Sequence, residues 1–385
     1  MSEYRSPLLD WPGAVPADPP DAGVADHYGD PLREQRAAVT GAALVDRSHR
    51  GVVRVGGPDR RSWLHSITSQ HLEALPPGRG TQLLVLSPQG RVEHHALVAE
   101  DGEATWLDLE PGDAPGLLGY LDSMRFMLRV EPADVTADRA VLSVVGPATR
   151  DVVASALELE AGGDPATIPA PAAARAADPA GATDGLYAVV QARSVAGAGH
   201  PPVLVRWMPY GADLLVPRAD LEAIFAALRA GGATPAGSSA FEALRVADRR
   251  PRHGRETDNR TIPHEVNWLP TAVHLDKGCY RGQETVARVH NLGRPPRRMV
   301  LLHTDGATAP HGAPVIDTAT GRPVGFVGTS AVHHELGPIA LAVIKRAIAD
   351  DATLVVGEPD EPIAASIDPD EEPAAPTRPA GRLRH

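Results

Sequence analysis

From Arg297 onward, the chain reads as a series of short apolar runs that are separated by Gly and Pro. Five such runs follow one another, at 299–303, 313–316, 324–328, 339–344 and 353–356. Short strands at a spacing of roughly 8–12 residues, with turn residues between them, are typical of small antiparallel barrels and sandwiches. We therefore expect a C-terminal antiparallel β-barrel over residues 297–357. The Pro-rich and acidic stretch that follows predicts a disordered tail over 358–385.

Residues 29–296 show a different pattern, in which helical and strand-like segments alternate. Residues 31–43 have the composition of a helix, whereas 81–98 reads as a hairpin around Ser-Pro-Gln-Gly at 87–90. A further strand is expected near 125–131. This mixture predicts an α+β region, and the similar content of its parts indicates two similar sub-domains.

Two segments lack any sustained period. Residues 1–28 are rich in Pro, Gly, Ala and Asp, and residues 161–183 are rich in Ala, Pro and Gly. Such compositions bury little apolar surface. We expect a flexible N-terminal extension over 1–28 and a flexible insertion over 161–183.

Composition excludes several classes of function. No apolar run approaches the ~18–20 residues that span a bilayer, and the first residues lack the pattern of a signal peptide. One cysteine forms neither an internal disulfide nor, alone, a metal centre. No P-loop, H-E-x-x-H or C-x-x-C motif is present. These features predict a cytoplasmic protein without a membrane partner, and we expect a monomer.

Charge is unevenly distributed along the chain. The formal net charge is -12, which argues against a nucleic-acid partner. Residues 245–298 nevertheless carry eleven Arg and one Lys against six acidic residues, a net charge of +6. A basic segment in an acidic protein favours a compact anionic ligand. The alternative is that these arginines form a solvated surface.

Rare residue types gather in the sequence Lys-Gly-Cys-Tyr-Arg-Gly-Gln-Glu at 277–284. It contains the only cysteine, Cys279, and one of only two lysines, Lys277, in a chain with 35 arginines. Because Arg supplies positive charge elsewhere, a retained Lys indicates a need for a compact ammonium group. All three asparagines also lie between 257 and 291. We interpret this stretch as the functional segment.

Cys279 and Lys277 are the candidate catalytic residues. In an extended loop, residues two apart project to the same side, so the ammonium would favour the thiolate form of the cysteine. A thiolate serves as a nucleophile, a redox thiol or a soft-metal ligand. The alternative is that Cys279 is a small buried hydrophobic residue.

The rest of this motif has two readings. Gly278 and Gly282 are expected at positions that need unusual backbone angles or close approach. Gln283 and Glu284 open a helical stretch, so Glu284 either caps that helix or contacts a ligand. Tyr280 either stacks on a ligand or packs in the core. The adjacent histidine pairs at 94–95 and 333–334 point to opposite faces of a strand, so no metal site is predicted.

The motif at 277–284 resembles the signature of folate-binding YgfZ-type iron–sulfur cluster maintenance proteins, which are relatives of the glycine-cleavage T-protein, an aminomethyltransferase. Stretches at 48–59, 86–91, 241–246 and 262–267 agree in order, so the resemblance covers about residues 30–350. It implies a T-protein fold, with α+β units around a tetrahydrofolate site and a C-terminal β-barrel.

The resemblance also implies residues for the folate site. Folate needs polar groups for its pterin edge, an apolar slot, and Arg for its glutamate tail. Arg245, Glu265, Asn267 and Trp268 supply these chemistries, and Tyr280, Gln283 and Glu284 are further candidates. The T-protein's catalytic aspartate falls in the stretch 90–95, which here has no Asp. Glu93 would be its nearest substitute, with a side chain one methylene longer.

Two functions follow from the resemblance. The first is a tetrahydrofolate-binding accessory protein for iron–sulfur cluster assembly, delivery or repair, whose partners would be iron–sulfur client or assembly proteins. The second is a folate-dependent aminomethyltransferase or methyltransferase of one-carbon metabolism. A third reading is a scaffold that only binds proteins. The missing Asp and the Lys-Gly-Cys sequence favour the first.

Overall fold

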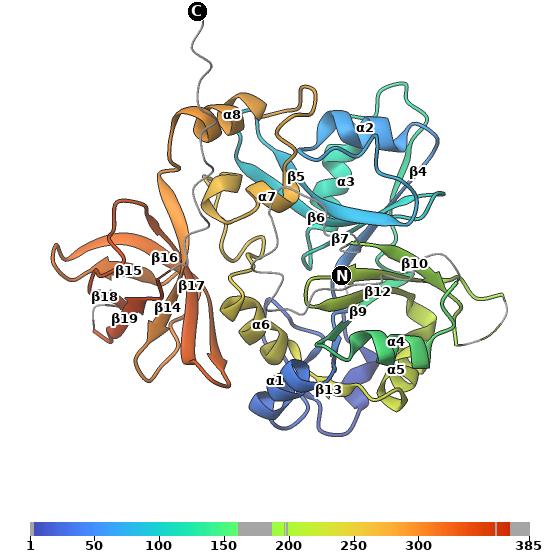
Figure 1. The fold of residues 1–385 in the computed structure, drawn as a ribbon, viewed down its shortest axis with the longest axis horizontal. Coiled ribbons are helices and arrows are strands. Elements are labelled where there is room, and N and C mark those ends of the chain that lie inside the picture. The colour runs from blue at the N-terminus through green and yellow to red at the C-terminus, as the bar shows by residue number, and fades with distance from the viewer. Residues whose placement is uncertain (1–3, 161–186, 196, 198, 359, 370–385) are drawn as a thin grey trace, which may run out of the picture.

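The structure is a computed structural model that describes residues 4–160, 187–195, 197, 199–358 and 360–369. Two α+β units and a β-barrel make up the described chain, and Figure 1 shows the barrel, in orange to red, beside the two units. This architecture confirms the expected α+β fold with a C-terminal antiparallel barrel. None of the described helices is long and apolar enough to cross a membrane.

Six strands form one sheet, in the spatial order β10-β11-β12-β9-β3-β13. They are β3 (Ala43–Asp46), β9 (Arg139–Val145), β10 (Val189–Ala192), β11 (Val203–Met208), β12 (Gly211–Pro217) and β13 (Thr234–Ala236). All neighbours are antiparallel except β13 with β3. Helices α4 (Thr149–Ala156) and α5 (Leu221–Ala230) pack on this sheet. Strands β9, β11 and β12 are buried along their whole length, and their sequences are largely apolar. The buried charged residues Arg206 and Asp213 interrupt β11 and β12.

Five antiparallel strands form the second sheet, in the order β5-β6-β7-β4-β8. They are β4 (Gly51–Gly56), β5 (Arg79–Leu86), β6 (Val92–Glu100), β7 (Thr105–Leu109) and β8 (Glu131–Asp134). Helices α2 (Arg60–Ile67) and α3 (Ala114–Ser123) share its core. The expected hairpin is therefore confirmed as β5 and β6.

The strand expected near 125–131 is wrong. Phe126 and Met127 are 81% and 99% exposed, and the strand β8 begins only at Glu131. An apolar run predicts a strand only when a core is available to cover it. Here the run lies in an exposed loop between α3 and β8.

The five-stranded sheet is inserted into the six-stranded one. Strand β3 ends at Asp46 and β9 begins at Arg139, and these two strands are paired neighbours. All five strands of the other sheet lie between them in sequence. The chain thus has two α+β units, as the pattern suggested, but they are nested rather than consecutive.

The barrel is closed in the order β14-β17-β16-β15-β18-β19. Its strands are β14 (Arg297–Thr304), β15 (Pro314–Asp317), β16 (Arg322–His333), β17 (Gly337–Lys345), β18 (Leu354–Val356) and β19 (Ile363–Ile367). Strand β19 pairs with both β14 and β18. The expected start of the disordered tail at 358 is therefore wrong, because 363–367 closes the barrel. Residues 370–385 lie outside the described residues.

The N-terminal segment is ordered from residue 4. It contains η1 (Pro7–Asp10), β1 (Val15–Pro16) and β2 (Ala25–His27). Leu8 is fully buried in the core of the six-stranded sheet, and the Trp11 ring meets Phe225 edge-on at 4.9 Å. The expectation of a flexible extension is wrong for residues 4–28, because Leu8 and Trp11 anchor this segment to the core. The expected insertion at 161–183 lies outside the described residues.

The remaining helices connect the units. They are α1 (Pro31–Thr40), α6 (Ser238–Ala247), α7 (Leu269–Ala272) and α8 (Gln283–Leu292), with 3₁₀ turns η2 (Arg218–Asp220) and η3 (Pro263–Glu265). Asp30 caps α1 by accepting hydrogen bonds from the backbone of Leu32 and Arg33, and Pro31 occupies its first position. Helix α6 contacts β3 of the six-stranded sheet and the barrel strands β16 and β17, so it joins these two parts (Figure 1).

Candidate functional site

A cavity of about 290 Å³ lies where the two sheets meet α6 and the loops that follow it. Apolar and aromatic side chains form part of its wall, namely Val45, Leu97, Met208, Tyr210, Phe241 and Trp268. Six arginines and four carboxylates of the described chain also line it: Arg47, Arg50, Arg245, Arg249, Arg250 and Arg252, with Asp21, Glu110, Glu242 and Asp248. An apolar pocket with convergent polar groups is the usual form of a small-molecule site.

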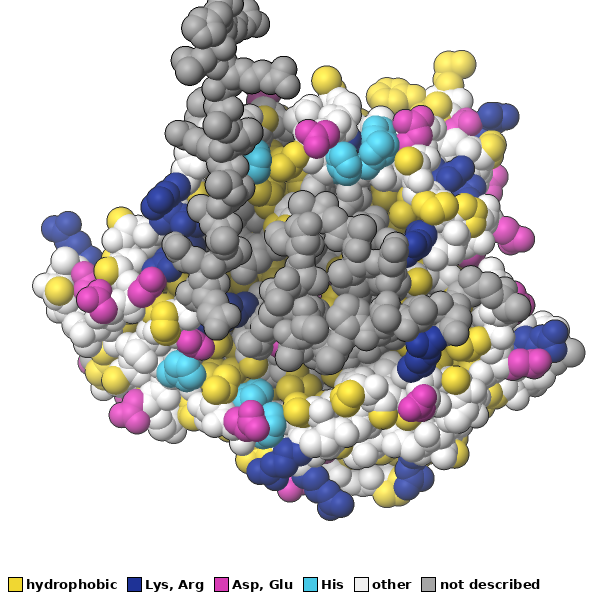
Figure 2. All heavy atoms as spheres, in the orientation of Figure 1, with side chains coloured by type: hydrophobic (Ala, Val, Ile, Leu, Met, Phe, Trp, Pro, Cys, Tyr) yellow, Lys and Arg dark blue, Asp and Glu magenta, His cyan; other side chains and the backbone are white. Residues whose placement is uncertain are grey.

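The arginine excess distinguishes this cavity from the outer surface. On the face shown in Figure 2, basic and acidic side chains are interspersed and form no single-sign field. Four of the six cavity arginines come from the basic segment 245–298. This part of the segment therefore directs charge inward, as a compact anionic ligand requires, whereas other arginines of the segment, such as Arg260, are exposed.

One wall of the cavity is built from stacked rings. The His95 imidazole on β6 lies parallel to the Trp268 ring, with centroids 4.5 Å apart and an interplanar angle of 15°. His95 Nε2 shares a 2.9 Å hydrogen bond with Gln82 Oε1, and Gln82 donates to the Tyr187 hydroxyl. Burial, together with nearby His253, lowers the pKa of His95 to about 3. The imidazole is therefore neutral at physiological pH.

Another part of the cavity lining is a network of ion pairs. Arg252 binds Asp21 with both terminal nitrogens, at 2.9 and 2.7 Å, and its Nε donates to Glu110 at 2.6 Å. Arg50 also donates to Glu110, and His49 shares a 2.8 Å hydrogen bond with Asp21. Burial disfavours the Glu110 carboxylate, but the neighbouring arginine charges outweigh burial and hold its pKa well below the usual range.

A second layer of charges lies behind this wall. Asp108 accepts hydrogen bonds from Arg50 and from the fully buried Arg206, which also donates to Asp213 at 2.9 Å. Asp213 accepts from the Tyr210 hydroxyl as well. Removing one member of such a network leaves a buried charge without a partner, so the network fixes the shape of the cavity.

Arg250 differs from Arg50 and Arg252 in the hydrogen bonds that its guanidinium makes. Its guanidinium lies over the Tyr210 ring, 4.4 Å from the centroid, and its nearest carboxylate contact is Asp248 at 3.6 Å. Its Nε and Nη2 are buried and have no hydrogen-bond partner among the described residues. Burial lowers its pKa, and Arg245 and Arg47 add to the effect. Unused buried donors of this kind favour an anionic ligand such as a carboxylate.

Comparison with known proteins identifies this architecture. Residues 25–166 match the family model described as the GCVT N-terminal domain. The chain is 29% identical to an aminomethyltransferase of Saccharopolyspora erythraea over 338 residues, which cover 85% of each chain. It is also 27% identical over 347 residues to an Arabidopsis thaliana protein named as a chloroplastic transferase, covering 87% of this chain and 73% of that one.

The fold agrees with the sequence match. Aminomethyltransferase T of the glycine cleavage system from Bartonella henselae superposes with a TM-score of 0.75, at 17% identity, over 94% of both chains. The region that matches the family model thus lies within a T-protein-like fold that extends over nearly the whole chain. These findings support the aminomethyltransferase-like part of the resemblance seen in the sequence.

Three of the residues predicted for folate binding line the cavity of this T-protein-like fold: Arg245, Asn267 and Trp268. Arg245, however, has its donors bonded to the protein, including Glu242 at 2.7 Å and Glu256 at 3.0 Å. Arg250 is therefore a better candidate than Arg245 for binding the glutamate tail of a folate. Asn267 has a φ of 59°, a left-handed angle that Asn tolerates better than most residues.

Four other predicted folate residues do not line the cavity. Glu265 accepts two hydrogen bonds from Arg297 and caps η3. Tyr280 is buried in the core between the hairpin, α8 and the barrel, so its packing role is the one observed. Gln283 and Glu284 begin α8, where Glu284 is exposed in the first turn. For Glu284, the position in the first turn of α8 agrees with the alternative that it caps this helix.

Lys277 and Cys279 also lie apart from the cavity, and they do not pair. Lys277 is 6% exposed, and its ammonium donates to the backbone carbonyls of His65, Thr68 and Gln70. Three carbonyls use all three donors of an ammonium group. Cys279 is exposed, and no hydrogen bond joins it to Lys277 in the described chain. The prediction that the ammonium lies beside the thiolate is therefore wrong, and so is the buried reading of Cys279.

The hairpin residue proposed to replace the T-protein aspartate is also placed elsewhere. Glu93 lies at a β-bulge of β6 and pairs with Arg281 at 3.1 Å, outside the cavity. His95, two residues later, is the side chain of this stretch that lines the cavity. No carboxylate of β6 lies in the described cavity wall.

Sequence reasoning missed most of the polar cavity wall. Asp21, Arg47, His95 and Arg250 come from four separate segments, and none belongs to a motif. The basic segment 245–298 was the one signal that included Arg250, but it contains eleven arginines. Only the fold distinguishes Arg250, whose buried Nε and Nη2 have no hydrogen-bond partner among the described residues, from arginines such as Arg252 with hydrogen-bonded carboxylates.

Proposed function

We propose that this chain binds a reduced folate in the cavity and acts as an accessory protein in iron–sulfur cluster assembly, delivery or repair. The observation that carries the folate proposal is the buried guanidinium of Arg250, with two donors unused beside an apolar and aromatic wall. The similarity to aminomethyltransferases supports the same ligand class, because the resemblance to the T-protein implies a tetrahydrofolate site.

The residues present suit the parts of a folate. Arg250 would pair with a carboxylate of the glutamate tail, and Arg47, which lies over Phe241 at 4.3 Å, would add to the positive field. Leu97, Met208 and Trp268 offer the apolar surface that a flat ring needs. When bound, tetrahydrofolate would supply a carrier for one-carbon units. The chain's residues bind it, orient it and exclude water from it.

The accessory role is favoured over group transfer by the cavity wall on β6. The position that the resemblance assigns to the T-protein's catalytic aspartate is represented at the cavity by neutral His95. Asp21 and Glu110 are held by arginines, which keep them ionised but use their oxygens. Cys279 is exposed, in a motif that resembles the signature of the YgfZ-type proteins, and would be accessible to an iron–sulfur partner protein.

Aminomethyl transfer is the second candidate, because the relatives named aminomethyltransferases align over 85% of this chain or more. The cavity also contains Asp248 and Glu242, whose carboxylates would serve as proton acceptors in such a reaction. The two functions differ in their products, so activity assays separate them.

Two measurements test the proposal. Calorimetric titration of the full chain with tetrahydrofolate should show one saturable site that weakens with salt, because part of the attraction is carboxylate to Arg. Absence of binding at millimolar ligand would remove the folate proposal. Deletion in the native cell should then lower the activity of several iron–sulfur enzymes while glycine cleavage is retained. The opposite pattern would favour aminomethyl transfer.

The role of Cys279 is tested in the same cells. Cys279→Ser should fail to restore iron–sulfur enzyme activity while binding tetrahydrofolate like the wild type, because the exposed thiol lies apart from the cavity. Full restoration by this variant would end the case for thiol chemistry at this residue.

A further inference from the structure

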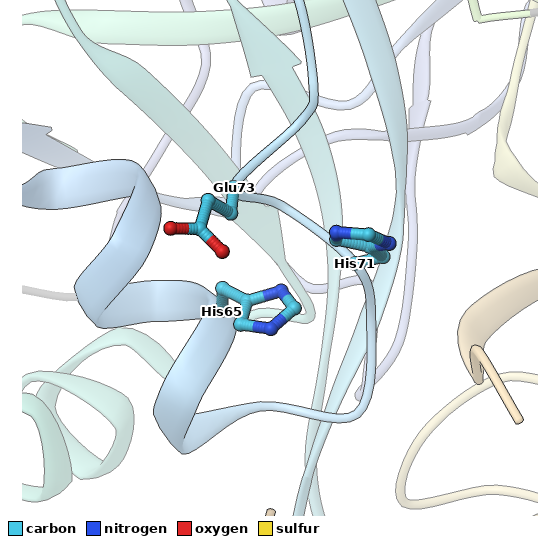
Figure 3. Close-up of side chains that lie close together, drawn as sticks. All are labelled: His65, His71 and Glu73. Carbon is cyan, nitrogen blue, oxygen red and sulfur yellow. The ribbon is translucent and has the colours of Figure 1, made fainter. Parts of the chain in front are cut away.

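Three side chains of metal-ligating type converge at the end of helix α2. His65 lies on α2, whereas His71 and Glu73 lie in the connection from α2 to β5, and Figure 3 shows the three gathered together. One candidate ligand atom from each lies within 4.8 Å of the others. Two ligands bonded to one ion at about 2.1 Å are at most about 4.2 Å apart. A shift of under about 1 Å would therefore complete a site, and the exposed side chain of Glu73 is free to make it.

The histidines here have unused nitrogens. Nδ1 of His65 is buried and has no hydrogen-bond partner among the described residues, and the same holds for Nδ1 of His274. The His71 ring lies 4.7 Å from that of His65 and meets His274 edge-on at 5.0 Å. Buried polar atoms without partners are uncommon in proteins, and a bound ion or water is one usual explanation.

The backbone that carries the two ligand histidines is held from outside. Lys277 donates to the carbonyls of His65, Thr68 and Gln70, so its ammonium ties together the segment from the first histidine to the residue before the second. The Ser69 hydroxyl donates to the carbonyl of Ala272 at 2.6 Å. These bonds fix the turn before any ligand arrives, which reduces the entropy lost on binding.

One nearby charge opposes a cation. The Lys277 ammonium lies close to His65 and repels positive charge. Its donors, however, are directed at carbonyl groups, and Glu73 brings one negative charge to the site. An imidazole pair with a carboxylate binds first-row transition metals far better than it binds Mg²⁺, whose preferred ligands are oxygen atoms.

We propose that His65, His71 and Glu73 form a binding site for a divalent first-row transition-metal ion, with Zn²⁺ as the best fit. Two histidines and one glutamate give three protein ligands and leave a position open for water or another molecule. The site is separate from the folate cavity, because none of its ligands lines that cavity. It therefore goes beyond the proposed function and does not depend on it. Nothing in the sequence indicated this site. The adjacent histidine pairs at 94–95 and 333–334 lie elsewhere, and the spacing 65, 71, 73 forms no known metal-binding motif.

Calorimetric titration of the chelator-treated full chain with Zn²⁺ tests this site. The wild type should bind one equivalent saturably, and His71→Ala and Glu73→Gln should each weaken binding at least tenfold. Loss of groups that only support a metal ligand already weakens binding by about 10–100-fold, and loss of a ligand should not weaken it less. Mg²⁺ should show no binding at the same concentrations. His290→Ala removes an exposed histidine on α8 and is the matched control, with affinity unchanged.

Folding does not confound this test, because Glu73 is exposed and its amide variant keeps the same shape. Equal Zn²⁺ affinity of the wild type and both ligand variants would overturn the proposal, since the ion would then bind elsewhere. Absence of saturable binding to the wild type below about 100 μM, or equal binding of Mg²⁺, would overturn it as well. Tetrahydrofolate binding by Glu73→Gln should remain at the wild-type value, so failure of one proposal is distinguishable from failure of the other.

Discussion

Arg245 and Arg250 lie on the same cavity wall, yet their guanidinium groups are satisfied differently. Arg245 binds Glu242, Glu256 and the Thr329 hydroxyl, and so ties α6 to the loop after it and to the barrel. Arg250 has two buried nitrogens without partners among the described residues. The first arginine therefore supports the fold, and the second is available to a ligand.

This difference predicts opposite behaviour of two equivalent substitutions. Arg245→Met should lower the free energy of unfolding by about 3–5 kcal/mol, because Glu256 would remain as an unpaired buried charge. Arg250→Met should leave stability nearly unchanged but weaken tetrahydrofolate binding about tenfold or more, since hydrogen bonds to charged groups contribute about 1.5–3 kcal/mol. Urea unfolding and calorimetry on both variants provide the measurement. Equal loss of stability in both variants would contradict this assignment.

His95 predicts a dependence of stability on pH. Its pKa is about 3 in the folded chain, where burial disfavours the charged form, and about 6.5 when unfolded. Between these values the unfolded state binds a proton that the folded state does not, so stability falls as the pH falls below 6.5. Acidification from pH 6.5 to 5 should remove about 1.6 kcal/mol through this group.

Comparison with His95→Gln isolates that contribution. Urea unfolding of both proteins at pH 6.5 and pH 5 should show a smaller loss in the variant, because a glutamine does not titrate. Other buried histidines act equally in both proteins and cancel. The same pH dependence in wild type and variant would mean that His95 is protonated within the fold.

At the scale of elements, the motif at 277–284 packs closely against the β5–β6 hairpin, and glycines at the contact allow this close approach. Gly282 has a φ of 84°, and a Cβ on it would lie 2.6 Å from the carbonyl oxygen of Ser87. Gly90 in the hairpin turn would meet Thr285 of α8 at 2.7 Å in the same way. The expected need for glycine is therefore confirmed for Gly282. It is wrong for Gly278, where a Cβ would meet no atom within 4 Å.

The two motif glycines should respond differently to the same substitution. Gly282→Ala should lower the free energy of unfolding by more than about 1 kcal/mol, because it combines a left-handed φ with contact against backbone. Gly278→Ala should be tolerated and serves as the control. Thermal or urea unfolding of the two variants gives the comparison. A stable Gly282→Ala protein would show that the hairpin and α8 are free to separate.

The sequence predicted elements well where the local pattern and the burial agree. The β5–β6 hairpin and the barrel strands have turn residues between apolar runs, and each run faces a core. The loop containing Phe126 and Met127 has the same kind of run without a core to cover it, and there the prediction was wrong. Local composition determines which segments are able to form strands, whereas tertiary contacts determine which of them do.

At the scale of the whole molecule, the cavity could be predicted only in part. Trp268 and Asn267 lie near the motif and followed from the resemblance. Asp21 and His95 reach the cavity from segments far away in sequence, and Arg250 is one of 35 arginines. The fold brings these residues together, and no spacing along the chain reports it. The exposure of Cys279 and the burial of Lys277 likewise depend on how distant loops close over the motif.

Residues 4–28 belong to this global assembly. Their removal should give an unfolded or insoluble chain, because it takes Leu8 from the core and leaves Arg252 and His49 without Asp21. A chain that starts at residue 4 is the matched control and should fold. Circular dichroism and soluble yield of the two chains provide the measurement. A folded, folate-binding chain that starts at residue 29 would restore the view of this segment as a dispensable extension.

Because one sheet is inserted in the other, the region that matches the family model does not coincide with a complete sheet. Strands β4 and β8, which begin and end the inserted sheet, pair side by side from Val53 with Asp134 to Gly56 with Glu131. The two ends of this block are therefore adjacent, and a single gene rearrangement would add or remove it without breaking the surrounding sheet. The region 25–166 has different ends: it contains β3 and β9 but not β10 to β13, their partners in the six-stranded sheet. A gene fragment with those limits would carry only part of the core of the six-stranded sheet, whereas one limited to the inserted block would carry a whole sheet.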